Sequence, residues 1–303
     1  MRNGNRHTST RWARTLRDFG HRVSVQVSWD EAPVDLMLAL HARRSHDSIK
    51  RFALLFPDRP LIVALTGTDL YRDIRSDADA QQSMLLATRM IVLQEMGLEE
   101  LSAKYAAKTR VIYQSAAAAA PQPRLKKCFE ICVIGHLRDE KDPLRAAQAL
   151  AHLPQDSAIR ISQLGRALDP ALEKNAKRIM AEDARYHWFG EIPHWRASQI
   201  LARSRVMVIS SRMEGGANVV SEALMAGVPV IASRISGNIG MLGKQYPGYF
   251  SFGDERALAK LLLRAEQDAD FYRSLKIHCR ERKKLISATA EKAALKKLIG
   301  EII

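Results

Sequence analysis

The sequence predicts an α/β protein of two domains, each built on a parallel sheet. Short apolar runs of strand length alternate with amphipathic helical patterns along most of the 303 residues, as in repeated βαβ units. The segment Ser115–Lys127 interrupts this pattern with an alanine run followed by Pro-Gln-Pro, which is typical of a linker. An apolar content of 47% is enough for a substantial core. We therefore expect an N-terminal domain over residues 1–120 and a C-terminal domain over 121–303.

The N-terminal domain is expected to open with a helix over Thr8–Phe19. Trp12, Leu16 and Phe19 share one face of that helix, and Gly20 stands where a C-terminal cap belongs. Apolar runs of strand length then follow along the domain. They predict strands at Arg22–Val27, Val34–Leu40, Leu61–Leu65, Met90–Leu93 and Arg110–Tyr113.

The C-terminal domain repeats the alternation of strand and helix. Its strands are expected at Phe129–Ile134, Arg160–Leu164, Val206–Ser210 and Val228–Ala232. Its helices are expected at Pro143–His152, Pro170–Glu182, Trp195–Ala202 and Asn218–Ala226. The tail from Asp268 onward is helical and basic in pattern, and its last helix is a candidate to cross back to the N-terminal domain.

Composition limits the classes of binding partner and the cellular compartment that we expect. A formal charge of +14 favours acidic partners, but zinc-finger spacing and RNP-type strands are missing, and aromatics are only 6%, so no nucleic-acid partner is expected. The cysteines Cys128, Cys132 and Cys279 form no close CxxC pair, which fits idle thiols in a reducing compartment. No apolar run of about 18 residues and no signal-type h-region occur, so we expect a cytoplasmic protein without stable membrane insertion.

The segment Ser210–Ser233 has the strongest functional pattern. An apolar strand runs into a Gly-containing loop, a helix follows, and a Gly-Val-Pro break opens the next strand. Free N–H groups at a helix start favour phosphate, and Gly215 and Gly216 allow the backbone to approach a ligand. Glu214 and Glu222 are spaced to accept hydrogen bonds from two diols of one extended ligand. Alternatively, Glu214 is only a negative charge that interacts favourably with the N-terminal end of the helix dipole, and Glu222 is only a solvated residue on the helix surface.

A second strand–loop–helix segment spans Val133–Arg145. The strand ends at Gly135, and Arg138 and Lys141 flank the turn before a helix expected at Pro143. Two cations there could neutralise a diphosphate and stabilise a leaving nucleotide. The alternative is surface pairing of both cations with the neighbouring Asp139 and Glu140.

These two segments resemble the donor domain of GT-B glycosyltransferases that carry an E-x7-E motif. Glu214 and Glu222 have that spacing, and the EGG, EAL and GVPVIAS stretches match as well. The resemblance implies two Rossmann-like domains facing across a cleft and a UDP-sugar as co-substrate, with no metal or other cofactor. Glu214 would then contact the donor sugar, Glu222 the ribose, and Arg138 with Lys141 the diphosphate. The implied donor-binding set is Gly135, Arg138, Lys141, Glu214, Gly215, Gly216, Ala217, Asn218 and Glu222.

Polar clusters in the N-terminal half lie at strand ends or a helix start. They occur in GNRHT, LHARRS, ALTGTDLYRD and VIYQS. With IGHLRDEKDP and SRMEGGANVVSEAL, this set is similar to the selenosugar synthase family of selenoneine biosynthesis. That resemblance covers nearly the whole chain. It implies transfer of N-acetylglucosamine or glucose from the UDP-sugar to selenophosphate, which forms a carbon–selenium bond at the anomeric carbon.

Selenophosphate is a small, multiply charged anion, so its pocket should be cationic. Arginines and hydroxyls of the polar clusters would supply the donors, and His41 and Asp69 would orient the acceptor. The expected acceptor-binding set is Asn5, Arg6, Thr8, His41, Arg43, Arg44, Thr66, Thr68 and Asp69. The expected catalytic set is His41, Asp69, Arg138, Lys141 and Glu214.

The start of the chain departs from the GT-B pattern, because Met1–Asn3 lead directly into the Gly-containing loop without a preceding strand. We therefore expect the first strand of the N-terminal sheet to be missing. Two other functions stay open: a GT-B enzyme acting on a sugar hydroxyl in polysaccharide or glycoconjugate assembly, and a basic binding protein without catalysis. The identity of the sugar, the anomeric outcome and the oligomeric state are not predicted.

Overall fold

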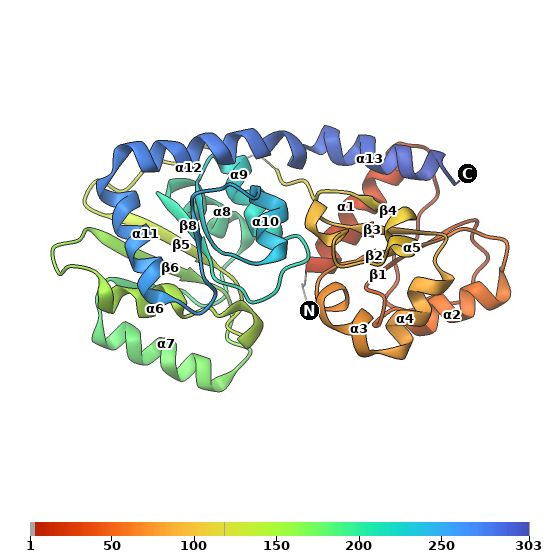
Figure 1. The fold of residues 1–303 in the computed structure, drawn as a ribbon, viewed down its shortest axis with the longest axis horizontal. Helices are drawn as coiled ribbons and strands as arrows, with labels where there is room; N and C mark the ends of the chain where they lie inside the picture. Colours follow the sequence, from red (N-terminus) through yellow and green to blue (C-terminus); the bar gives the residue numbers. More distant parts are fainter. Residues whose placement is uncertain (1–3, 118, 303) are drawn as a thin grey trace. The chain divides into compact units, whose positions relative to one another are not determined.

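The computed structural model describes residues 4–117 and 119–302, which form two α/β units (Figure 1). The first unit comprises Met1–Ser115, Glu214–Asn218 and Leu285–Ile303, and the second comprises Ala116–Met213 and Val219–Lys284. The prediction of a missing first strand falls on residues 1–3, and Ala118 belongs to the expected linker. Both lie outside the described residues.

The sheet of the first unit has four parallel strands in the order β1-β2-β3-β4 within the described residues. The strands are β1 (Met37–Leu40), β2 (Leu61–Leu65), β3 (Arg89–Val92) and β4 (Thr109–Val111). The helices are α1 (Gly4–Asp18), α2 (His46–Leu55), α3 (Ile74–Ser76), α4 (Ala78–Leu86), α5 (Ala103–Ala107) and α13 (Ala288–Gly300). A π-helical turn, Asp69–Asp73, follows β2, and a 3-10 turn, Glu95–Gly97, follows β3.

Strand β2 shows how both faces of this sheet are covered. Leu61, Val63 and Leu65 pack into a cluster with residues of α2 and α4. Ile62 and Ala64 pack on the opposite face with residues of α1 and α13. Side chains alternate across a strand, so a continuous apolar run is expected where helices cover both faces. The prediction of a strand at Leu61–Leu65 is confirmed.

A buried glutamate attaches the last helix to the first unit. Glu291 in α13 is only 3% exposed. It accepts hydrogen bonds from the indole Nε1 of Trp12 at 2.7 Å, from Nε of Arg11 at 2.8 Å and from the hydroxyl of Ser115. Because burying a carboxylate is costly unless it is paired and hydrogen-bonded, these donors make the docking of α13 specific.

The prediction of a strand at Arg22–Val27 is wrong. Residues 22–27 form no strand, and Val25 and Val27 are exposed. The only described neighbour of β1 is β2, so residues 22–27 have no described ladder partner. An alternating apolar pattern fits a strand but does not supply the pairing that a strand needs. The next strand is also shorter than expected, since β1 begins at Met37 rather than Val34.

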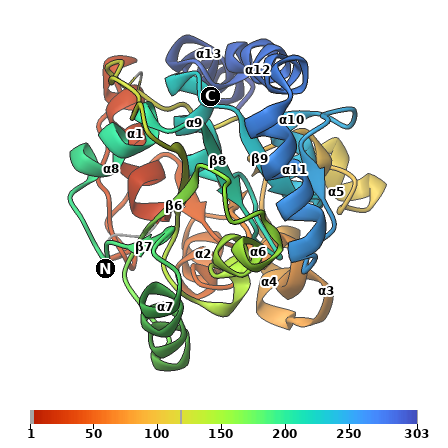
Figure 2. The same ribbon diagram turned by 90° about the vertical axis from the view of Figure 1, so that its left-hand side faces the viewer.

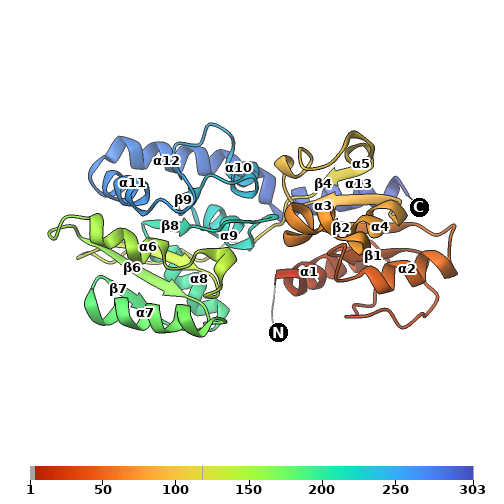
Figure 3. The same ribbon diagram turned by 60° about the horizontal axis from the view of Figure 1, so that its bottom comes forward.

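The second unit has a six-stranded parallel sheet in the order β10-β9-β8-β5-β6-β7 within the described residues. The strands are β5 (Phe129–Ile134), β6 (Ile159–Leu164), β7 (Tyr186–Trp188), β8 (Val206–Ile209), β9 (Val230–Ser233) and β10 (Tyr249–Phe250). The helices are α6 (Arg145–Ala149), α7 (Pro170–Glu182), α8 (His194–Arg203), α9 (Asn218–Ala226), α10 (Ser236–Leu242), α11 (Glu255–Gln267) and α12 (Ala269–Arg282). Helices α6 and α11 lie side by side, and α7 runs beside β7 (Figures 2 and 3).

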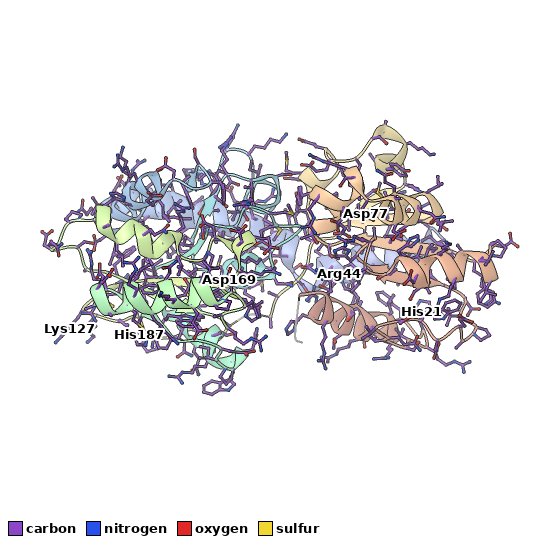
Figure 4. The ribbon with its side chains drawn as sticks, turned by 90° about the horizontal axis from the view of Figure 1, so that it is seen from below. His21, Arg44, Asp77, Lys127, Asp169 and His187 are labelled. Atoms are coloured by element: carbon purple, nitrogen blue, oxygen red, sulfur yellow. The ribbon has the colours of Figure 1, made fainter. Side chains whose placement is uncertain are left out.

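Local signals explain which boundaries the sequence predicts well. Helix α7 has the predicted bounds because Asp169 (labelled in Figure 4) accepts the N–H of Ala171 at 2.8 Å and Pro170 occupies the first helical position. The helix expected at Pro143–His152 is instead a short α6 followed by a 3-10 turn, Leu150–His152. It starts late because Asp142 adopts a left-handed φ of 43°.

The strand order creates a switch point between β5 and β8. From β5 the chain builds β6 and β7 to one side, and it then returns to place β8, β9 and β10 on the other. The loops that follow β5 and β8 therefore leave neighbouring strands at the same sheet edge. In open α/β sheets, ligands bind in the crevice at this kind of position. Within the described part of the chain, no helix combines the length and apolar character needed to cross a membrane.

Candidate functional site

The loop after β5 is held by the loop after β6. The N–H of Gly135 donates to the carbonyl of Leu164 at 2.9 Å. Gly165 has a φ of +136°, and a Cβ at this position would lie 2.5 Å from the carbonyl carbon of Gly135 and 2.9 Å from the nitrogen of His136. Only glycine fits this approach without moving the backbone. Gly165 therefore positions Gly135 but was not among the predicted site residues.

The basic turn after Gly135 is tied to the loop after β8. The hydroxyl of Ser210 donates to the carbonyl of Asp142 at 2.7 Å, and the N–H of Arg212 donates to the carbonyl of Glu140 at 2.9 Å. Arg138 is exposed, with Nε 3.9 Å from a carboxylate oxygen of Glu140. This distance is too long for a hydrogen bond. The ion pair between Arg138 and Glu140, which the sequence analysis kept as an alternative, is therefore weak. Lys141 ends the 3-10 turn Asp139–Lys141 that follows Arg138.

Glu222 of α9 has a partner from the first turn of α8. Nε2 of His194 lies 3.3 Å from Oε1 of Glu222, and about a quarter of the Glu222 side chain is exposed. The hydrogen bond to Glu222 raises the pKa of His194 above its usual value, against the opposing effect of partial burial. A ligand diol that binds Glu222 at this oxygen would have to compete with the imidazole.

The segment Glu214–Asn218 belongs to the first unit, whereas Glu222 belongs to the second. Glu214 is 8% exposed and Ala217 5% exposed. A Cβ at Gly215 would lie 2.5 Å from the carbonyl carbon of Thr66, and one at Gly216 would lie 2.5 Å from Cβ of Leu93. Both glycines are therefore required by the packing of this segment against the chain after β2 and β3. This requirement comes in addition to the ligand approach expected from the sequence.

A pocket of about 330 Å³ lies in the first unit, at the turns that follow β1 and β2. Its lining residues are His41, Arg43, Arg44, Thr68, Arg72 and Asp73. Arg43 and Arg44 (the latter labelled in Figure 4) both reach it, because residues 41–45 form a turn rather than a strand. Three guanidinium groups give the pocket the chemistry of an oxyanion site.

His41 lines this pocket, and its hydrogen bonds favour one tautomer. It is 3% exposed, and its pKa is lowered by burial and by the nearby Arg44 and Arg43, although Asp69 opposes the shift. Nδ1 accepts the N–H of Arg44 at 3.3 Å, so the neutral ring carries its proton on Nε2. Nε2 then donates to the hydroxyl oxygen of Thr68 at 2.9 Å. The Thr68 hydroxyl consequently keeps its own proton for another acceptor.

Asp69 connects the two turns that form the pocket. It is fully buried, and Oδ1 accepts the N–H groups of Thr66 and Gly67 at 2.9 and 2.8 Å. Oδ2 accepts the N–H of Ala42 at 3.0 Å. Neither Asp69 nor Thr66 lines the pocket. Asp69 therefore holds the two turns together through their backbone N–H groups, and Thr66 lies in the supporting loop. The catalytic role expected for Asp69 stays a prediction.

The predicted acceptor residues of α1 are not brought to the pocket. The helix starts at Gly4, earlier than Thr8, so Asn5, Arg6 and Thr8 all lie in its first turns. Thr8 is 1% exposed, and its hydroxyl donates to the carbonyl of Gly4 at 3.0 Å and accepts from the amide of Gln114. Thr8 is therefore a buried residue whose hydroxyl already has two partners, and its role as an acceptor ligand stays a prediction.

Arg72 and Asp73 are pocket residues that the sequence analysis did not select. They end the π-helical turn Asp69–Asp73, within the TGTDLYRD stretch. Nε of Arg72 donates to Oδ1 of Asp73 at 2.8 Å, and Nη1 of Arg43 lies 3.7 Å from the same oxygen. The only sequence feature that could have identified them is their position close after the Thr-Gly-Thr-Asp turn. A surface arginine–aspartate pair gives the same pattern in a sequence.

Two of the cysteine thiols are buried and poorly suited to nucleophilic chemistry. Burial raises the pKa of Cys132 and of Cys279, so both thiols stay protonated near neutral pH. Over residues 4–117 and 119–302, no group of three His, Cys, Asp or Glu side chains is arranged to hold a metal ion.

Comparisons with known proteins identify the family. A family model for glycosyl transferases group 1 matches residues 117–282. The chain is 29% identical over 113 residues to glycosyltransferase 1 domain-containing protein 1 of Xenopus tropicalis. That match covers 37% of this chain and 33% of the relative, so the chain spans about a third of the length of that curated protein.

Solved structures of similar fold cover most of the chain. HepE from Anabaena, in complex with UDP-glucose, has a TM-score of 0.72 at 16% identity, over 88% of this chain and 79% of that one. Sucrose-phosphate synthase from Thermosynechococcus elongatus has a TM-score of 0.71 at 20% identity, over 88% and 73% of the two chains. At such identities the likeness shows the GT-B fold, with a parallel-sheet α/β domain in each half. Since the family model covers more than half of the sequence, the chain belongs to the glycosyl transferases group 1 family.

Proposed function

We propose that this chain transfers N-acetylglucosamine or glucose from a UDP-sugar to selenophosphate and so forms a carbon–selenium bond. The observation that carries the proposal is the pocket lined by Arg43, Arg44 and Arg72 in the first unit. Its volume of about 330 Å³ is large enough for a tetrahedral oxyanion, and its side chains supply far more donors than acceptors.

The donor side of the proposal rests on the switch point of the second sheet. Arg138 and Lys141 follow β5 and would neutralise the diphosphate, while Glu222 would accept hydrogen bonds from the ribose. Glu214 would bind the transferred sugar. The bound UDP-glucose of HepE supports this choice of donor. The cationic side chains would take the role that a metal has in other transferases, so we propose a reaction without metal or other cofactor.

The acceptor side explains why no strong base is needed. The proton of neutral His41 already occupies Nε2, so this nitrogen cannot remove a proton from an acceptor. An anionic selenium would attack the anomeric carbon directly with its own electron pair. The bond from that carbon to the diphosphate oxygen would break, and UDP would leave with the electron pair toward Arg138 and Lys141.

A sugar hydroxyl as acceptor, in polysaccharide or glycoconjugate assembly, is the second candidate. One observation favours it: Oδ2 of the buried Asp73 has no hydrogen-bond partner and belongs to a residue that lines the pocket. Such an oxygen could accept the proton of an attacking hydroxyl. The two candidates differ in whether UDP release depends on selenophosphate.

The test measures UDP release from UDP-N-acetylglucosamine and from UDP-glucose, with and without selenophosphate, and identifies the product by mass spectrometry. We expect selenophosphate-dependent release and a selenium-containing sugar. Arg44→Ala should lose this dependence, whereas Arg51→Ala, on an exposed helix face paired with Glu31, should keep it. Release that sugar hydroxyls stimulate and selenophosphate does not would contradict the proposal and favour the second candidate.

A further inference from the structure

The pocket of the first unit contains one group that its cationic character does not explain. Asp73 is 3% exposed, and its Oδ1 is engaged by Arg72. Its Oδ2 has no hydrogen-bond partner, although the atom is buried, and it lies 4.0 Å from Nε2 of His41. A buried acceptor without a partner costs free energy, so its persistence in a ligand pocket points to a partner on the ligand.

We infer that Asp73 makes this pocket selective for an oxyanion that carries a proton, with the P–O–H group donating to Oδ2. The arginines would hold the ionised oxygens, and Thr68 would donate its hydroxyl proton to one of them. A fully ionised tetrahedral anion would place an oxygen lone pair against the Asp73 carboxylate. Repulsion of that kind discriminates between anions of similar size and shape.

This inference rests on the proposed function, because it concerns the acceptor pocket, and it specifies the ionic form of the acceptor. A hydrogen selenophosphate bound through its P–O–H to Asp73 would have its only proton on oxygen. The selenium would then be unprotonated. Asp73 is in this sense a specificity-determining residue, since it would select the ionic form in which selenium is the free nucleophile.

Phosphate and sulfate test the inference without a donor sugar or any transfer. Both are tetrahedral oxyanions, but near neutral pH only phosphate carries a proton. Their affinities for the full chain are measured by calorimetric titration at equal ionic strength, because salt screens such contacts. We expect phosphate to bind about tenfold to a hundredfold more tightly than sulfate, the range for one hydrogen bond to a charged group.

The variant Asp73→Asn should remove this preference, because an amide can donate to sulfate as well as accept from phosphate. Asp77→Asn is the matched control. Asp77 also pairs with Arg43, at 3.2 Å, and caps α4, which asparagine can do equally, but it does not line the pocket. This control should keep the phosphate preference, and thermal unfolding should show that both variants are folded.

The inference is overturned if the unmodified chain binds both anions equally or binds neither. It is also overturned if the two variants change the preference to the same extent. A chain that prefers phosphate but makes no selenosugar would refute the transfer reaction and leave the inference about Asp73 intact. The two failures can therefore be told apart.

Discussion

Replacing Gly165 with alanine should displace the proposed diphosphate loop without changing any residue of the proposed donor-binding set. The new Cβ would lie 2.5 Å from the carbonyl carbon of Gly135, whereas ordinary van der Waals contact begins at 3.4 Å. The loops after β5 and β6 would have to separate by about 1 Å, and displacements of that size cost about a hundredfold in well-oriented sites. Alanine at a φ of +136° adds a backbone cost of about 1–3 kcal/mol.

The assay compares UDP affinity and thermal unfolding of Gly165→Ala with those of Gly253→Ala. Gly253 also has a positive φ, +82°, but a Cβ there would meet nothing within 4 Å. Both variants should lower the Tm by several degrees, at about 2–4 °C per kcal/mol. Only Gly165→Ala should weaken UDP binding, by tenfold or more. Equal UDP affinity in the two variants would refute the argument that Gly165 positions the Gly135 loop.

Four further predictions concern donor binding, acceptor binding and metal dependence. The pair with Glu222 raises the pKa of His194, and a ribose that binds Glu222 would remove the pair and release the proton. UDP affinity should thus be highest above this raised pKa and should fall as the pH drops through it, and His194→Ala should flatten the profile. Arg138→Ala or Glu222→Ala should weaken UDP-sugar binding about tenfold or more in a direct titration. Arg43→Ala or Arg44→Ala should raise the KM for selenophosphate and leave UDP affinity unchanged. Dialysis against EDTA should leave the rate of UDP release unchanged, and loss restored by Mg²⁺ would contradict the metal-independent mechanism.

Secondary structure was predictable where a strand or helix carries its own boundary signals. Pro170–Glu182 has an aspartate cap and a first-position proline, and Leu61–Leu65 is a fully buried apolar run. The strand expected at Arg22–Val27 failed because pairing depends on a neighbouring strand, which a local pattern does not report. Strand β10 has only two residues, too few for any periodicity to appear.

The positions of the proposed donor residues in the fold were predictable because their segments combine spacing with strand-end position. Glu214 and Glu222 are fixed relative to one strand and one helix start, and Gly135 ends a strand whose bounds were predicted correctly. Their partners were not predictable. His194 approaches Glu222 from another helix, and the need for glycine at Gly165 arises only where two loops meet. Such partners depend on the sheet order, which places β6 and β8 on either side of β5.

The proposed acceptor pocket shows why residue type alone does not predict which side chains lie together. Thr8 and Thr68 are both threonines in polar clusters, yet the hydroxyl of one is bonded within the core while the other lines the pocket. Their difference is decided by Asp69, which binds the N–H groups of both turns and so brings Thr68 against His41. A buried carboxylate that organises backbone donors has the same sequence signature as one that touches substrate. Only the tertiary structure distinguishes a carboxylate that organises the backbone from one that contacts substrate. For Asp73 the distinguishing observation is a single oxygen, Oδ2, that has no hydrogen-bond partner.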